Sequence, residues 1–352
     1  MIIHNEKISL KSGDKLALLG NFSTMITAGI PLLETVDSLL EDSKGNAKKV
    51  LEIIREDIMQ GHHLYSSFSK FPNTFDKVTI NVLRASEEAG TLDVTLKDLR
   101  TQIQKEIAFN DKIKGALTYP IIILAVFLAV LLLILTVVIP KISTVFSRLT
   151  VNLPLPTKIL ITLSNALLHH TILVVIGIIL FIVGVVLLYR AQKRQILNVI
   201  YKAPFISDLV REIDLARFSR SMFLLLTSGI TITSALELTQ DVVMRKDVTK
   251  AIKYAKETVL GGKNLSQGFK EQKRVFSAII IKMIEAGEKT GTLDKSMQDI
   301  SEQQDYRVDN SLKTLTTLLE PVMLVTVGLL VGGVMMAIIA PIYGLIGQVS
   351  AR

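Results

Sequence analysis

Three long apolar runs restrict the possible folds of this chain more than any other feature of its sequence. The first run covers 119–139, the second covers 171–189, and the third extends from Pro321 without a charged residue until Arg352. A helix of about 20 apolar residues is long enough to cross the hydrocarbon core of a bilayer. A helix buried in a soluble protein usually keeps some polar positions. The runs therefore predict an all-α membrane protein with three transmembrane helices.

The basic residues predict how these helices are oriented. Lysine and arginine cluster before the first run and after the second, whereas the loop between the two runs carries only Lys141, Arg148 and Lys158. Basic flanks are enriched on the cytoplasmic side, so we expect both large polar segments in the cytoplasm and the loop outside. The net charge of +8 then fits an anionic membrane surface. With no tryptophan and 6% aromatic residues to stack on bases, no nucleic-acid partner is expected.

The two polar segments are copies of one sequence. Residues 61–68 return as 262–269 with glycine, leucine and phenylalanine at matching places, and Gly-Thr-Leu-Asp at 90–93 returns unchanged at 291–294. Apolar residues between 50 and 58 recur at helical spacing. Each copy is therefore expected to be a helical-bundle domain. The two domains are expected to pack on each other or to form dimers.

The duplication divides the chain into a domain and a span, a linking span, and a second domain and span. The expected boundaries are 1–13 for a short N-terminal segment, 14–114 for the first cytoplasmic copy, 118–140 for the first transmembrane helix, 141–168 for an external loop, 169–190 for the second transmembrane helix, 208–316 for the second copy and 320–347 for the third transmembrane helix. Because the linking span returns the chain to the cytoplasm, both copies keep one orientation, unlike the inverted repeats of many transporters. No apolar core precedes the first copy, so no signal peptide is expected.

The repeated Gly-Thr-Leu-Asp motif marks a candidate site near a helix corner. Glycine ends a helix easily in the left-handed conformation, threonine can cap the next helix, and aspartate suits its positive first turn. This structural interpretation explains the motif without a ligand. The alternative is a partner contact, to which nearby glutamates add negative charge. The candidate partner or helix-corner residues are Glu87, Glu88, Gly90, Asp93, Glu288, Gly291 and Asp294.

A second group of candidates lies in or beside the apolar runs. Pro120 and Pro321 suit the first turn of a membrane helix, where a missing N–H costs little. Gly328 and Gly332 permit close approach of another helix, and we favour packing within the protomer or in a dimer over contact with another protein. Glu320 is either an interfacial residue or a buried functional group.

No catalytic arrangement is apparent in the sequence. The absence of cysteine excludes thiolate catalysis and disulfides. The segment 261–264 lacks the upstream glycine and the Ser/Thr of a phosphate loop. The adjacent His62 and His63 fit a solvated pair better than a metal site. No loop with oxygen ligands for a metal is visible. We therefore expect no enzyme activity, no cofactor and no metal.

Several motifs, taken together, resemble a known family. They are Ala85 to Leu92, Gly115 to Pro120, Leu153 to Thr157 and Met283 to Leu293. With the duplication and the three spans, these residues resemble the type II secretion F and type IV pilus PilC inner-membrane platform proteins. The resemblance covers about 16–348. The short segment before the first copy resembles members from type IVb pili and competence pseudopili.

The resemblance implies a role in the bacterial inner membrane. Such a platform couples a cytoplasmic hexameric ATPase to the extraction of pilin or pseudopilin helices from the bilayer. Its implied partners are that ATPase, the pilin or pseudopilin, other inner-membrane assembly proteins and further copies of itself. One alternative is a small-solute transporter or channel subunit, which should carry polar residues inside its spans. A membrane-bound signalling protein should carry a ligand pocket or an effector domain.

Overall fold

The computed structural model describes residues 8–147, 155–169 and 206–349, and the predicted second span lies outside them. Every regular element in these ranges is a helix, so the prediction of an all-helical chain is confirmed for the described residues. The chain divides into two compact units. The paired-domain unit comprises Met1–Lys112 and Pro204–Asn310, and the apolar unit comprises Ile113–Ala203 and Ser311–Arg352.

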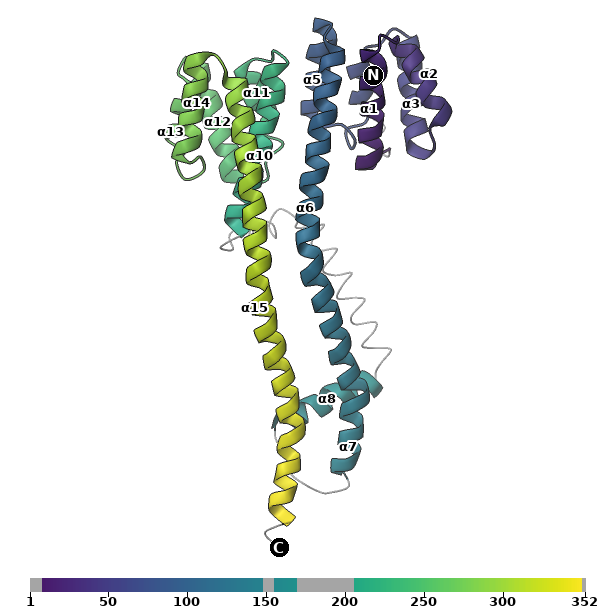
Figure 1. Ribbon diagram of the computed structural model, residues 1–352, viewed down its shortest axis with the longest axis vertical. Coiled ribbons are helices and arrows are strands. Elements are labelled where there is room, and N and C mark those ends of the chain that lie inside the picture. The colour runs from purple at the N-terminus through teal and green to yellow at the C-terminus, as the bar shows by residue number, and fades with distance from the viewer. Residues whose placement is uncertain (1–7, 148–154, 170–205, 350–352) are drawn as a thin grey trace. The chain divides into compact units, whose positions relative to one another are not determined.

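The two halves of the paired-domain unit have the same order of helices (Figure 1). The first copy contains α1 (Ser12–Thr27), α2 (Leu32–Asp42), α3 (Gly45–Met59), α4 (Leu64–Ser69), α5 (Lys77–Ala89) and the start of α6 (Leu92–Leu133). The second contains α10 (Ile206–Thr227), α11 (Ile232–Thr239), α12 (Lys246–Leu260), α13 (Leu265–Lys270), α14 (Ala278–Thr290) and the start of α15 (Leu293–Val349). Each copy is therefore a bundle of five shorter helices closed by one long helix.

A cluster of three buried phenylalanines forms the centre of each bundle. In the first copy Phe68 and Phe75 stack with ring centroids 4.3 Å apart, and Phe22 meets Phe68 edge-on at 6.1 Å. In the second copy Phe269 and Phe276 lie 4.0 Å apart, but the third ring comes from Phe218. Phe218 precedes the position that matches Phe22 by one helical turn, so it projects from the same face of its helix. Both copies therefore have a core of three phenylalanine rings, but the ring contributed by the first helix of the copy comes from one turn earlier in α10 than in α1.

The long helices α6 and α15 pass without a break from the domains into the apolar runs. Within the described residues these are the two helices that are long and apolar enough to cross a membrane. The expectation that Pro120 and Pro321 open membrane helices is wrong, because both prolines lie inside these long helices. Each proline removes one backbone hydrogen bond, and membrane helices tolerate this loss where neighbouring helices, Ser/Thr side chains or ordered water satisfy the freed carbonyl group.

The apolar unit contains an irregular turn after the first run. A π-helical turn, η1 (Ile134–Val138), joins α6 to α7 (Ile139–Ser147), and Pro140 follows in the first turn of α7. The helix α8 (Leu155–His169) packs against η1, and the Ser164 hydroxyl donates to the Leu135 carbonyl at 2.6 Å. The described parts of the expected external loop are therefore largely helical.

Candidate functional site

The repeated Gly-Thr-Leu-Asp sequence forms the same helix corner in both copies. Gly90 ends α5 with φ 70°, and Gly291 ends α14 with φ 71°. The Thr91 N–H donates to the Ser86 carbonyl at 2.8 Å, and the Thr292 N–H donates to the Gly287 carbonyl at 2.9 Å. This bond across five residues, with a left-handed glycine inside it, is a Schellman motif. The corner connects the last short helix of each domain, α5 or α14, to the long helix that follows it.

The glutamates beside the corner point inward and cap a helix. The Glu87 carboxylate accepts from the N–H groups of Leu64 and Tyr65, at 2.8 and 3.0 Å, at the start of α4. The Glu288 carboxylate accepts from the N–H groups of Leu265 and Ser266 at the start of α13. These donors have no partner within their own helices. Both carboxylates therefore serve the internal fold and are not directed toward a partner protein.

Among the other acidic candidates, Glu88 is exposed and Asp93 and Asp294 are half-buried. Glu88 forms an exposed ion pair with Arg84 at 2.9 Å, and the second copy reverses this pair as Glu285 and Lys289, also at 2.9 Å. The partners within each pair lie one helical turn apart. Asp93 and Asp294 occupy the first turns of α6 and α15, where a carboxylate suits the helix dipole.

The corner of the second copy is packed more tightly than that of the first. A Cβ added to Gly287 would lie 2.9 Å from the Ser296 Cβ and 3.0 Å from the Leu293 Cα, so α14 and α15 approach closely at this glycine. The first copy has Ser86 at the matching position, and its hydroxyl donates to the Leu83 carbonyl at 2.9 Å. The sequence difference between the two corners is therefore a difference in helix spacing.

The two copies meet through α5 of the first and α10 and α11 of the second. Three exposed ion pairs join them: Lys77 to Asp241 at 2.6 Å, Lys105 to Glu302 at 3.4 Å and Lys112 to Asp309 at 2.7 Å. The last two pairs are one heptad apart on both long helices, which is the spacing of side chains on facing helices. The pairs align the long helices within the paired-domain unit.

Arg220 is the most buried cation of this interface. Its guanidinium donates to both carboxylate oxygens of Asp305, at 2.8 and 2.7 Å, and lies 5.7 Å from the centre of the Phe109 ring. The first copy has Gly20 at the matching position, and the Arg100 side chain covers that glycine. The arginine at this contact therefore comes from the long helix α6 in the first copy (Arg100) and from the first helix of the bundle, α10, in the second copy (Arg220).

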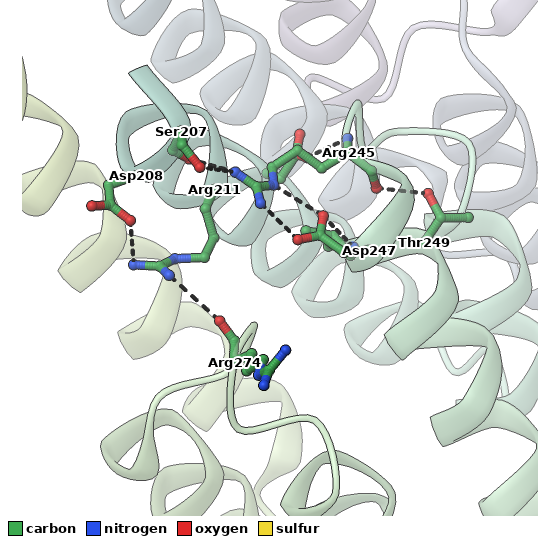
Figure 2. Close-up of polar contacts among 9 residues, drawn as sticks. Ser207, Asp208, Arg211, Arg245, Asp247, Thr249 and Arg274 are labelled. Carbon is green, nitrogen blue, oxygen red and sulfur yellow. Dashed lines mark hydrogen bonds and ion pairs between the residues drawn. The ribbon is translucent and has the colours of Figure 1, made fainter. Parts of the chain in front are cut away.

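The second copy also contains a polar network that fixes the start of α12 (Figure 2). The buried Asp214 carboxylate accepts from the N–H groups of Met244 and Arg245 at 2.8 and 2.7 Å. Burial raises the pKa of the Asp214 carboxyl group, although the two N–H groups oppose this shift. The Arg245 guanidinium joins Asp247 to the main chain of Ser207. In the first copy Asp14 occupies the position of Asp214 but is exposed.

Apart from Pro120, which lies in α6, the membrane candidates lie in α15. Glu320 is exposed, and no described atom lies within 4 Å of a Cβ added to Gly328 or Gly332. The packing within the protomer that we favoured for these glycines is therefore not seen among the described residues. An apolar groove of about 360 Å³ lies between α6 and α15 in the apolar unit. Its lining comprises Ile122, Ile123, Val126, Phe127, Val130, Leu131, Ile134, Val327 and Val331.

The described residues contain no group of three or more His, Cys, Asp or Glu side chains that could hold a metal ion. The carboxylates described above cap helices or form ion pairs with lysine and arginine side chains. The chemistry that these arrangements support is recognition and packing.

Sequence reasoning missed two features of the site, the inward role of the glutamates and the exchange of arginines. The same interval separates Leu64 from Glu87 and Leu265 from Glu288, but any two blocks of a duplicated sequence keep their interval, so this regularity does not show that the blocks contact each other. The exchange of Arg100 for Arg220 leaves no signal either, because it depends on which helix faces meet.

Comparison with known proteins places the chain among secretion and pilus proteins. The family model described as type II secretion system (T2SS), protein F, matches residues 18–140 and again 218–341. The prediction of two repeated domains is therefore confirmed. The chain is 30% identical to the type IV pilus assembly protein PilC of Myxococcus xanthus over 340 residues, which are 96% of this chain and 81% of that protein.

Two further relatives extend the comparison. The type IV pilus assembly protein PilC of Thermus thermophilus is 30% identical over 356 residues, with 98% of this chain and 86% of that protein covered. The type II secretion system protein F of Aeromonas hydrophila is 26% identical over 345 residues, with 96% and 88% covered. The similarity therefore extends over both domains and both long helices.

Proposed function

Because this chain belongs to the type II secretion system protein F family, we propose that it is a multi-pass membrane platform of a type IV pilus or type II secretion machine. The observation that carries the proposal is the double match of the family model to two helical copies. Each copy continues as one helix into an apolar segment. The relatives bear the names of both machines, and the proposal covers both.

The proposed location is the bacterial inner membrane, with three crossings and both copies in the cytoplasm. Support comes from two helices that are long and apolar enough to cross a bilayer. The second of the three apolar runs, 171–189, lies outside the described residues, and its composition alone supports a further crossing. The basic flanks support a cytoplasmic position for both domains.

We propose that the paired-domain unit binds the cytoplasmic assembly ATPase. Its two bundles have cores of closely packed phenylalanine rings, each has a glutamate beside the corner that caps a short helix, and ion pairs join the two bundles. A unit of this kind can receive a force without unfolding locally, and the helical backbones of α6 and α15 run on from it into the apolar segments. The work of the protein is then mechanical coupling, with no reaction and no cofactor.

The apolar segments are proposed to receive the pilin or pseudopilin helix. The groove between α6 and α15 is lined entirely by aliphatic and aromatic side chains, which suits an apolar helix leaving the bilayer. The open Gly328 and Gly332 on α15 allow close contact with a helix of another molecule. That helix belongs to a pilin, to another inner-membrane assembly protein or to a second copy of this chain.

The test is co-purification of the full chain, in a mild detergent, with the assembly ATPase of its own host. The tagged chain is expected to retain the ATPase, while a tagged unrelated multi-pass protein retains none. If a correctly folded chain retains neither a pilus ATPase nor a secretion ATPase under these conditions, the coupling role is wrong.

A further inference from the structure

A basic cavity lies on the second copy where the start of α14 meets α15. The cavity has a volume of about 180 Å³ and is open to solvent. Ser277, Ile280, Gln304 and Arg307 are among its lining residues. The cations that also line it are Arg211, Lys273 and Arg274. No part of the function proposed above uses this cavity.

The matching surface of the first copy is occupied by a helix. Asp76, Thr79, Ile103 and Glu106 are the counterparts of the four residues named above, and they line a cavity of about 280 Å³. Arg217, Arg220, Ser221 and Leu224 of α10 also line that cavity. Within the paired-domain unit, this surface of the first copy is therefore a docking surface for a helix that carries two arginines one turn apart.

The two surfaces carry opposite charges. Ser277 replaces Asp76, and Arg307 replaces Glu106. Lys273 and Arg274 stand where the first copy has a proline and an asparagine. In the first copy, Asp76 and Glu106 share a cavity with Arg217 and Arg220, and Arg220 takes its carboxylate partner, Asp305, from its own copy. The corresponding surface of the second copy has lost both acidic groups and gained cations, so it favours carboxylates.

The ion pairs formed near the basic cavity neutralise Arg211 alone among the cations that line it within the described residues. Asp208 pairs with Arg211 at 3.0 Å, and Arg211 also donates to the Arg274 main-chain carbonyl at 3.4 Å (Figure 2). Glu212 also lines the cavity and has a partner of its own. In the part of the chain that the structure describes, the side chains of Lys273, Arg274 and Arg307 form no ion pair.

Two buried polar groups in the cavity also lack a partner. Gln304 is 1% exposed, and its Nε2 has no hydrogen-bond acceptor among the described residues, whereas the first copy has the apolar Ile103 there. The Ser277 hydroxyl, at the start of α14, is likewise buried and unpaired. An unsatisfied buried donor is costly, and a carboxylate entering the cavity can accept from both groups.

We propose that this surface of the second copy binds an acidic helix of a partner protein, with carboxylates one turn apart, in the way that the first copy binds α10. A second copy of this chain fits less well, because its own α1 presents Ala17 and Gly20 at the positions of Arg217 and Arg220. The proposal does not depend on which partner drives the machine.

The test uses the full chain in neutral detergent and a soluble, labelled, alanine-rich helical peptide with a stripe of glutamates. The same peptide with glutamines is the matched probe. Fluorescence anisotropy is expected to detect binding of the glutamate peptide to the chain and no binding of the glutamine peptide. The variant Arg274→Glu with Arg307→Glu is expected to weaken that binding by about tenfold or more. Gln304→Leu, which leaves the net charge unchanged, is expected to weaken it several-fold.

Lys295→Glu serves as the charge control, because Lys295 is exposed on α15 away from the cavity. It is expected to leave binding unchanged. Equal weakening by Lys295→Glu, or no weakening by the double variant, overturns the proposal. It is also overturned if inorganic phosphate displaces the peptide as effectively as free peptide does, which indicates a small-anion site. A change of the chain's oligomeric mass in the double variant without a change in peptide binding identifies a self-association surface instead, and likewise contradicts the proposal.

Discussion

Replacing Glu87 with alanine is expected to lower the free energy of unfolding of the first copy by about 3 kcal/mol, because two N–H groups at the start of α4 then lose their shared acceptor. Leu64 is buried, so water cannot fully replace the carboxylate at its N–H group. The same change at Glu288 is expected to have a similar effect on the second copy. Glutamine keeps one acceptor oxygen, and Glu87→Gln should therefore lose less than Glu87→Ala.

The adjacent Glu88 provides the control. Its carboxylate forms one exposed pair with Arg84, so Glu88→Ala should leave the stability unchanged. Denaturant unfolding of the full chain in detergent, followed by circular dichroism, measures all four variants. If Glu87→Ala and Glu88→Ala unfold at the same denaturant concentration as the unaltered chain, the capping role assigned to Glu87 is wrong.

Replacing Arg220 with alanine is expected to cost the second copy about 3 kcal/mol, because the change leaves Asp305 without its partner in a half-buried site. It also removes the contact with Phe109 and one wall of the cavity between the copies. The loss should appear as a lower midpoint of denaturant unfolding and as faster cleavage of the paired-domain unit by an added protease.

The first copy indicates how this loss can be repaired. It places glycine and arginine where the second copy has Arg220 and Ser301. The double variant Arg220→Gly with Ser301→Arg should therefore recover part of the lost stability, because a guanidinium at 301 lies one turn from Asp305. If the double variant is less stable than Arg220→Ala, the two arrangements are not interchangeable, and our interpretation of the exchange is incorrect.

Helix content, the repeat and the apolar runs were predictable because each leaves a pattern along the chain. The Gly90 and Gly291 corners belong to this class, since a left-handed helix end depends on local sequence. The inward direction of Glu87 was not predictable from its neighbours, because Glu88 has the same chemistry and points to solvent. The side of α5 that faces α4 decides which of the two glutamates is a capping residue, and this depends on how the two helices pack.

The prolines illustrate a different limit. A hydropathy window finds where an apolar run begins, but α6 begins at Leu92, well before the run that contains Pro120. A polar helix that continues into an apolar one has no sequence signal at the junction. The significance of the lost negative charge at Ser277 and of the reversed charge at Arg307 was likewise apparent only after the matching surface of the first copy was seen to contact α10.

Both copies are proposed to lie on the cytoplasmic side of one membrane, and the chain between them is proposed to cross that membrane twice. The chain contains no cysteine, so single introduced cysteines report without background. Gln60→Cys, Lys158→Cys and Lys263→Cys place one thiol each in the first copy, in α8 and in the second copy, all at exposed positions. In spheroplasts, a membrane-impermeant maleimide is expected to label the thiol at 158, and to label those at 60 and 263 only after the membrane is permeabilised. Labelling of positions 60 and 263 from opposite sides of the intact membrane would contradict the account.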